Sequence, residues 1–154
     1  MRLILMRHGE ASWQAPVDSD RPLSKHGVQQ VQQQAIGSVI DWQGFAQLLA
    51  SPYLRTQQTS QLLQQYLGTN WPQTNSSLLT PDSHCDAVQE LLLTQPQVDT
   101  VIVTHQPLIS CLIGHFCHGD IMAGEPMMPA SVALLSGPVF ARQCMQLENL
   151  VHVN

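Results

Sequence analysis

Two arginines and two histidines in this chain have side chains that together can bind and transfer a phosphoryl group. Arg7 and His8 directly follow a short apolar run, and His105 directly follows a second one. Arg55 comes shortly after a third apolar run, near the start of an expected helix. The planar guanidinium of arginine binds two phosphate oxygens at once, and a neutral imidazole nitrogen is a competent nucleophile near neutral pH. Because the chain has only six lysines and arginines in total, these cationic positions are candidates for a specific role.

The apolar runs before these residues are too short for a helical stripe and are typical of strands buried on both faces of a parallel sheet. We expect strands over residues 3–6, 48–50 and 101–104. Parallel strands end at the same edge of a sheet, and ligands bind at that edge in open α/β folds. The strand over 48–50 leads into the helix that carries Arg55, and the free amides and dipole of a helix start attract an anion. The two histidines and two arginines are therefore expected to converge at one edge.

Apolar periodicity and capping residues predict the remaining elements. These are a helix capped by Ser24 that continues through Gly37 to Ile40, a helix from Ser51-Pro52 to Gly68, a short strand at Leu78-Leu79, a helix starting at Thr80-Pro81-Asp82 and ending before Pro96, a helix over 108–116, and closing strands over 132–135 and 144–147. Gly119 to Pro129 form a loop rich in methionine, glycine and proline. The alternation of strands and helices predicts an α/β fold, a three-layer α/β/α sandwich with a mainly parallel central sheet, in which residues 1–154 form one domain.

The composition argues against several classes of partner and cofactor. The net charge is −5, with six basic against eleven acidic residues, so the chain lacks the basic surface that suits nucleic acid or an anionic membrane. The four cysteines have no CxxC spacing and no paired histidines, which indicates neither a zinc site nor a redox motif. No apolar run approaches membrane-spanning length. We therefore expect a cytoplasmic monomer that uses no metal and no other cofactor.

Three short motifs in this order resemble the histidine phosphatase superfamily, which is phosphoglycerate mutase-like in fold. They are the RHG motif of Arg7-His8-Gly9-Glu10, Ser51-Pro-Tyr-Leu-Arg-Thr-Gln-Gln-Thr59 and Val101-Ile-Val-Thr-His-Gln106. Each motif is weak alone, but the set, with each motif following a strand, is specific. The short chain, the segment Arg21-Pro22-Leu23-Ser24 and the absence of a large cap insertion are similar to the small SixA-type phosphohistidine phosphatases. The resemblance covers nearly the whole chain.

This resemblance implies a metal-independent phosphatase, a hydrolase in which His8 is the nucleophile and becomes phosphorylated. Three further side chains would bind the transferring phosphoryl group and stabilise its charge, namely Arg7, Arg55 and His105. Arg21 would add a contact at the rim of the pocket, although its loop could instead place it in a plain ion pair with Asp18 or Asp20. Gly9 would let the backbone turn close to the phosphate, because glycine has no side chain.

The segment in which larger relatives have a glutamate as proton donor reads Ser76-Ser-Leu-Leu-Thr-Pro-Asp82 here, with no glutamate. Asp82 is a possible substitute, but it is also typical of the N-terminal end of a helix. An alkoxide needs such an acid, whereas imidazole, with a pKa of about 6.5 for its conjugate acid, is a better leaving group. The missing glutamate therefore favours a phosphohistidine substrate over phosphate esters.

The resemblance implies, as the protein substrate, a histidine-containing phosphotransfer domain of a signal-transduction relay or a phosphocarrier protein. One alternative is a small phosphatase of sugar or organic-acid phosphate esters, which would depend on Asp82 or another nearby acid. A second alternative is a phosphate-binding module without turnover. The presence of His8 together with both arginines argues against this last hypothesis.

Overall fold

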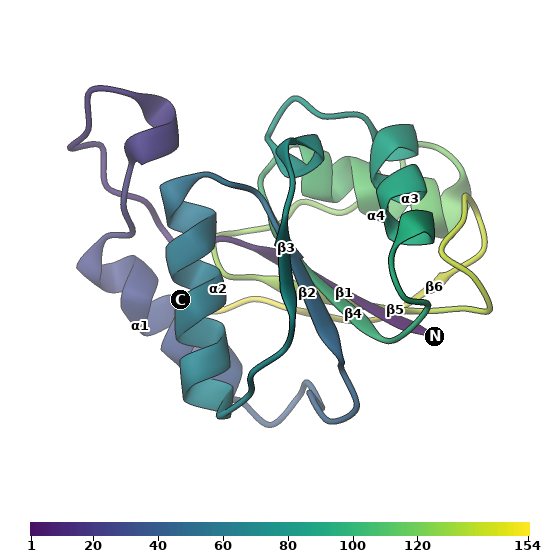
Figure 1. The fold of residues 1–154 in the computed structure, drawn as a ribbon, viewed down its shortest axis with the longest axis horizontal. Helices are drawn as coiled ribbons and strands as arrows, with labels where there is room; N and C mark the ends of the chain where they lie inside the picture. The colour runs from purple at the N-terminus through teal and green to yellow at the C-terminus, as the bar shows by residue number, and fades with distance from the viewer.

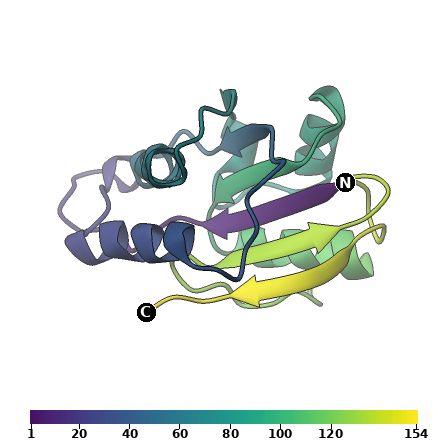
Figure 2. The same cartoon turned by 90° about the horizontal axis from the view of Figure 1, so that it is seen from below.

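The strands of the protein form one six-stranded sheet in the order β3-β2-β4-β1-β5-β6, in a computed structural model that describes residues 1–154. The strands are β1 (Arg2–Arg7), β2 (Gln47–Ala50), β3 (Gln73–Asn75), β4 (Thr100–Thr104), β5 (Val132–Ser136) and β6 (Gln146–Val151). The first four strands are mutually parallel, whereas β5 pairs antiparallel with β1, and β6 pairs antiparallel with β5. Figure 2 shows the arrow of β1 pointing opposite to that of β5. The prediction of a mainly parallel sheet is confirmed.

Four α-helices cover the sheet, two on each face (Figure 1). They are α1 (Lys25–Ile36), α2 (Leu54–Leu67), α3 (Cys85–Thr94) and α4 (Leu108–His118), with two 3₁₀ turns, η1 (Asp18–Asp20) and η2 (Ser77–Leu79). Helices α1 and α2 form one outer layer, and α3 and α4 form the other, which confirms the three-layer sandwich without a large cap insertion. None of these helices combines the length and the apolar character that crossing a bilayer requires.

Two apolar cores lie on opposite faces of the sheet because successive side chains of a strand point to opposite sides. In β1, Leu3 and Leu5 belong to the core beneath α3 and α4, while Ile4 and Met6 belong to the core beneath α1 and α2. All four side chains are fully buried. Each contributes roughly 1.5–3 kcal/mol by leaving water. The nucleophile candidate, His8, therefore follows a strand that is anchored on both faces.

Several predicted boundaries were wrong, and local backbone chemistry explains the differences. Ser24 caps α1 as predicted, accepting a hydrogen bond from the backbone N–H of Gly27 at 3.0 Å. The helix does not continue through Gly37, which is its C-cap, so residues 38–40 are not helical. Glycine is the poorest helix former apart from proline and ends α1 there. Gly68 ends α2 as predicted, in the left-handed conformation with φ 67°.

The start of α2 and the segment after it also differ from the prediction. The α2 helix begins at Leu54 and not at Pro52, because Ser51 accepts a hydrogen bond from the Tyr53 backbone in a turn before the helix. The predicted strand at Leu78-Leu79 is the 3₁₀ turn η2, and β3 lies earlier in the polar segment. The predicted helix start at Thr80-Pro81-Asp82 is a turn, and α3 begins at Cys85. The last strand runs over Gln146–Val151 and not over 144–147.

Two glycines allow the segment after β1 to pack directly on α1. A Cβ atom on Gly9 would lie 2.6 Å from the carbonyl oxygen of Gly27, and a Cβ atom on Gly27 would collide with the carbonyl oxygen of Glu10. Both obstacles are backbone atoms, which have no rotamer with which to move aside. The absence of side chains at Gly9 and Gly27 therefore sets the distance between the His8 segment and the first helix.

We expect Gly27→Ala to destabilise the protein by about 1–3 kcal/mol, the usual cost of overpacking a tight contact. The added methyl group would push the Glu10 backbone away from α1, and the segment after His8 would move with it. Urea denaturation measures the loss of stability. Gly37→Ala, at the other end of the same helix, is the control, because Gly37 has φ −64° and a Cβ there would lie no closer than 3.3 Å to another atom. Equal stability of Gly27→Ala and the wild type would contradict the packing argument.

Candidate active site

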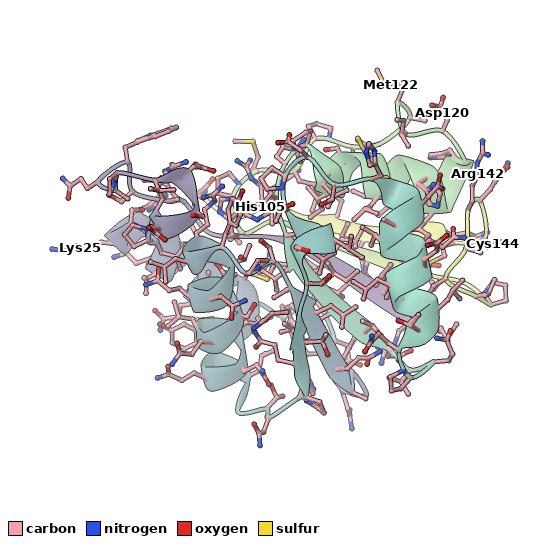
Figure 3. The ribbon with its side chains drawn as sticks, turned by 45° about the horizontal axis from the view of Figure 1, so that its top comes forward. Lys25, His105, Asp120, Met122, Arg142 and Cys144 are labelled. Carbon is pink, nitrogen blue, oxygen red and sulfur yellow. The ribbon has the colours of Figure 1, made fainter.

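The sheet order places His8 and His105 side by side at the carboxyl edge of the sheet. Strands β1 and β4 are parallel neighbours, and their last residues, Arg7 and Thr104, are paired. The residue that follows each strand is a histidine. The two rings meet edge to face, with centroids 5.2 Å apart and an interplanar angle of 64°. Strand β2 is the other neighbour of β4 and leads into α2, which brings Arg55 to the same edge. In Figure 3 the labelled His105 lies between the two helical layers.

A cavity of about 330 Å³ lies at this edge and brings together residues that are far apart in the sequence. Its walls are formed by Arg7, His8, Glu10, Ala11, Trp13, Arg21, Arg55, His105, Gln106 and Pro129. Five of the six residues predicted for the site therefore line one pocket. The sixth, Gly9, contributes backbone, and its carbonyl oxygen contacts the His8 ring. The structure brings together the two histidines and two arginines that were predicted to converge, and it adds Arg21 to the same pocket.

The hydrogen bonds of His8 define which ring nitrogen is available as a nucleophile. Nδ1 lies 2.6 Å from the carbonyl oxygen of Gly9, which can only accept, so Nδ1 carries the proton and donates it. Nε2 is then the nitrogen with the free lone pair, and it accepts a hydrogen bond from Nε of Arg55 at 3.3 Å. Burial lowers the pKa of His8 to about 3, opposed by the Gly9 hydrogen bond and assisted by the nearby arginine charges. The ring is therefore neutral and nucleophilic at physiological pH.

The backbone of His8 is held on both sides by neighbouring segments. Its N–H donates to the carbonyl of Thr104 at 3.1 Å, and its own carbonyl accepts from the N–H of Ala130 at 2.9 Å. The following N–H, of Gly9, donates to the hydroxyl of Thr59 on α2 at 3.1 Å. None of these bonds involves the imidazole, so the backbone at position 8 would be held in the same way without the ring.

Arg55 is buried, and Asp18 accounts for most of its hydrogen bonds. Nη1 donates to the backbone carbonyl of Asp18 at 2.7 Å, and Nη2 pairs with the Asp18 carboxylate at 3.2 Å. The same carboxylate accepts from Arg21 at 3.1 Å. Burial alone would raise the pKa of Asp18, but the hydrogen bonds and charges of Arg21 and Arg55 hold it below its ordinary value. Asp18 thus links the two arginines as an anion.

Arg21 combines the two placements that the sequence left open. It is paired with Asp18, and it also lines the pocket. Its Nε donates to the carbonyl of Ser12 at 2.9 Å, and its guanidinium lies 3.6 Å above the Trp13 ring. A cation over an indole face adds a stabilising contact of about 0.5–1 kcal/mol at exposed sites. Arg21 therefore orders the loop that forms one wall of the pocket.

Arg7 and His105 complete the polar lining. Nη1 of Arg7 donates to the carbonyl of Met127 at 2.8 Å, and Nε2 of His105 lies 2.8 Å from the hydroxyl of Ser51. Burial, followed by the charges of His8 and Arg55, lowers the pKa of His105 to about 2. Burial and the charge of Arg55 also lower the pKa of Arg7. The pocket is thus positively charged through its arginines, while both histidines are neutral.

Asp82, the sequence candidate for a proton donor, is exposed and does not line the pocket. A helix start was predicted at Thr80-Pro81-Asp82, but α3 begins only at Cys85, so Asp82 lies in the turn before the helix. The one carboxylate among the lining residues is Glu10, which accepts a hydrogen bond from the Ser24 hydroxyl at 3.1 Å. Glu10 is the last residue of the Arg7-His8-Gly9-Glu10 motif, but no role was predicted for it from the sequence.

Other contributors were also missed from the sequence. Asp18 was noted only as a possible ion-pair partner of Arg21, and its contact with Arg55 is set by η1 packing on α2. Trp13 and Gln106 line the pocket, and Ser51 holds His105. Ser51 and Gln106 belong to the motifs over 51–59 and 101–106, so a place in the pocket could have been predicted for both. No pattern of spacing would have identified Trp13.

The two neutral histidines make the protein sensitive to acid. Their folded pKa values, about 3 for His8 and about 2 for His105, lie below the value of 6.5 for a free histidine. The unfolded chain therefore binds more protons, and stability rises with pH up to about 6.5 and falls as the pH drops below it. We expect the two rings together to cost about 2–3 kcal/mol between pH 7.5 and pH 5.5, measured by urea denaturation. His105→Gln should remove about half of this loss, the share of one ring. A stability that does not fall on acidification would contradict the burial of neutral rings.

Known proteins with similar sequences point to one family. Residues 3–78 match the sequence model of the histidine phosphatase superfamily (branch 1). Phosphohistidine phosphatase SixA of Escherichia coli (strain K12) is 33% identical over 125 residues, which cover 78% of this chain and 76% of that protein. The probable phosphoglycerate mutase GpmB of Salmonella paratyphi A is 27% identical over 135 residues, which cover 85% of this chain but only 58% of that protein.

A solved structure of the protein histidine phosphatase SixA complexed with tungstate has the same fold. It superposes with a TM-score of 0.84 at 24% identity, covering 99% of this chain and 97% of that one. The alignment leaves almost no residue of either chain unmatched, so the two share the arrangement of helices and strands without a large insertion.

Proposed function

We propose that this chain, which belongs to the histidine phosphatase superfamily, hydrolyses phosphohistidine in a protein substrate through a phospho-His8 intermediate. The chain is a phosphatase of the hydrolase class. The observation that carries the proposal is the neutral His8 ring, with its Nδ1 proton fixed by Gly9 and its Nε2 lone pair facing Arg55. The identity with SixA, a phosphohistidine phosphatase, supports the choice of substrate.

In the first step, Nε2 of His8 attacks the phosphorus atom, and the bond between phosphorus and the leaving group breaks. Arg7, Arg55 and His105 bind the phosphoryl oxygens and stabilise their negative charge. Arg55 must move its Nε–H from His8 to the phosphoryl group, so substrate binding uncovers the nucleophile. The carbonyl of Gly9 keeps Nδ1 protonated and stabilises the positive charge that the ring gains on phosphorylation.

In the second step, water attacks the phosphorus atom of phospho-His8. The electron pair of the phosphorus–nitrogen bond returns to Nε2, and inorganic phosphate leaves with the oxygen of the water. Because Nδ1 has kept its proton throughout, His8 leaves as a neutral imidazole and needs no acid of its own. The enzyme is thereby returned to its starting protonation state.

A protein substrate suits the mouth of the pocket. The fold has no inserted cap over the site, and Trp13, one of its walls, is 82% exposed. Met128, next to the lining residue Pro129, is 57% exposed. Exposed aromatic and methionine side chains are enriched where proteins bind each other. The substrate would be a phosphotransfer domain or a phosphocarrier protein, acted on by a monomer of this chain.

The decisive experiment offers the enzyme a phosphohistidine protein and a panel of small phosphate esters. We expect a higher kcat/KM for the phosphohistidine protein, because its imidazole leaves without a strong acid. Mass spectrometry of a reaction quenched under conditions that preserve phosphohistidine should find a phosphoryl group on His8. Faster turnover of the esters would overturn the choice of substrate. Bound but unmodified protein would support a binding module without turnover.

A second candidate function, a phosphatase of small phosphate esters, is favoured by one observation. Glu10 places a carboxyl group on the pocket wall, where it could protonate an alkoxide leaving group. If this function is correct, Glu10→Gln should lower kcat/KM for esters by about 100-fold or more. Hydrolysis of phosphohistidine at an unchanged rate by Glu10→Gln would restrict any such role of Glu10 to ester substrates.

A further inference from the structure

Three buried polar atoms without a hydrogen-bond partner belong to residues that line the pocket. Five such side-chain atoms occur in the chain, and the three at the pocket are Nε of Arg7, Nδ1 of His105 and Oε1 of Gln106. Most buried polar groups in proteins are paired, so a cluster of unpaired ones indicates groups that await a ligand. The arginine N–H is a donor, and an imidazole nitrogen is a donor in one of its two neutral tautomers. Both suit the oxygens of a phosphoryl group, but the oxygen of Gln106 does not.

The orientation of the Gln106 amide follows from its neighbours. The hydroxyl of Ser110 lies 2.6 Å from the backbone carbonyl of Glu125, and a carbonyl can only accept, so the hydroxyl donates its single proton there. The same hydroxyl lies 2.6 Å from the Gln106 side chain and must accept from it. The atom that faces Ser110 is therefore the NH₂ group of Gln106. Its carbonyl oxygen is left as the unpaired acceptor.

The Gln106 oxygen can pair only with a donor, and a phosphoryl dianion has none to offer. A phosphohistidine ring has one when the nitrogen that does not carry phosphorus is protonated. That proton also decides how the ring leaves. With the proton present the ring departs as neutral imidazole, and without it the ring would have to depart as an anion. An acceptor for this N–H therefore favours the form of the substrate that reacts.

We propose that Oε1 of Gln106 accepts a hydrogen bond from the free ring N–H of the substrate phosphohistidine and so selects its protonated form. This inference rests on the proposed function and names a residue that determines its specificity. In the step itself, the His8 Nε2 lone pair forms a bond to phosphorus, and the bond from phosphorus to the substrate nitrogen breaks. The electron pair goes to that nitrogen, and the proton stays on the other ring nitrogen, beside Gln106.

The His8 ring of the enzyme has a comparable hydrogen bond. Nδ1 of His8 donates to the carbonyl of Gly9 at 2.6 Å while Nε2 reacts, as the substrate's free N–H would donate to Gln106 while its other nitrogen reacts. The unpaired atoms are covered from water by the side chains around them, and Nε2 of His8 is likewise covered by Arg55.

The test compares Gln106→Met, which has a similar shape without the amide oxygen, with Gln106→Glu, which keeps an acceptor. Hydrogen bonds that involve a charged group are the stronger class, so we expect Gln106→Met to lower kcat for a phosphohistidine protein by about 10- to 100-fold. The alkaline limb of its kcat–pH profile should move down by about one pH unit, because kcat reports the pKa values of the bound complex. Gln106→Glu should keep that limb at or above the wild-type position. The Kd for inorganic phosphate, measured by calorimetry, should be unchanged in Gln106→Met.

Three results would overturn the inference. The first is an unchanged kcat–pH profile in Gln106→Met, and the second is an alkaline limb displaced equally in the methionine and glutamate variants. The third is a loss confined to the hydrolysis of isolated phospho-His8, which would make Gln106 a residue that orients water. Wild-type activity on the phosphohistidine protein tests the proposed function separately, so the two proposals fail by different observations.

Discussion

Replacing His8 with alanine is expected to reduce turnover of a phosphohistidine protein by about 10⁴-fold or more, the scale seen when a nucleophile is removed. The proton on Nδ1 of His8 is fixed by the Gly9 carbonyl, so Nε2 is the attacking atom, and alanine removes it. The fold is expected to survive, because the backbone bonds of His8 to Thr104 and Ala130 do not use the imidazole. Steady-state kinetics measures the first effect, and circular dichroism during thermal unfolding measures the second.

The exposed His26 on α1 provides the matched control. His26→Ala removes the same side chain at a position outside the pocket, so its kcat/KM should match the wild type. Two outcomes would argue against the mechanism. Activity of His8→Ala within tenfold of the wild type would exclude His8 as the nucleophile. Unfolding of His8→Ala would show that the ring is structural.

Arg55→Lys is expected to lower kcat by about 10²- to 10³-fold, the usual cost of removing a donor aimed at developing charge. Lysine keeps the charge but lacks the planar fork, so it cannot contact Asp18 and the phosphoryl group in the same geometry. It also lacks the Nε–H that reaches His8 at 3.3 Å. The loss should appear mainly in kcat, because the charge that assists substrate binding is retained.

Arg142→Lys is the control for the same chemical change elsewhere. Arg142 is exposed and donates to the carbonyl of Gly119, apart from the residues that line the catalytic pocket. Its kinetic constants should remain within about twofold of the wild type, as expected for a surface substitution far from the chemistry. If Arg55→Lys were equally neutral, the assignment of Arg55 to the phosphoryl group would be wrong.

The positions of His8, His105 and Arg55 could be predicted from the sequence because each follows a strand of the parallel sheet. A buried strand such as β1 or β4 is an apolar run whose end is visible in the sequence. Since parallel strands end at the same edge, the convergence of their terminal residues follows without knowledge of the strand order. The order β2-β4-β1 then made the two histidines immediate neighbours, which the sequence could not specify.

The parts that the sequence could not give depend on loops and on local competition between hydrogen bonds. The α2 start moved because Ser51 bonds within a turn and also reaches His105, two contacts that a capping pattern does not contain. Asp18 meets Arg55 only because a 3₁₀ turn in an irregular segment packs on a helix 34 residues or more further along the chain. The proposed role of Gln106 depends on which way its side-chain amide points. A hydrogen bond to Ser110 sets that orientation, and the sequence does not show this contact.

The backbone hydrogen bonds on both sides of His8 bear on how the substrate specificity can evolve. Because its backbone is bonded to Thr104 and Ala130 directly beyond β1, we expect His8, the proposed nucleophile, to be held nearly as firmly as the central strands. The residues that we propose for contact with a protein substrate, Trp13 and Met128, lie outside helices and strands. Substitutions at these two positions during evolution can therefore change which phosphorylated protein is bound, without changing the residues that break the phosphorus–nitrogen bond.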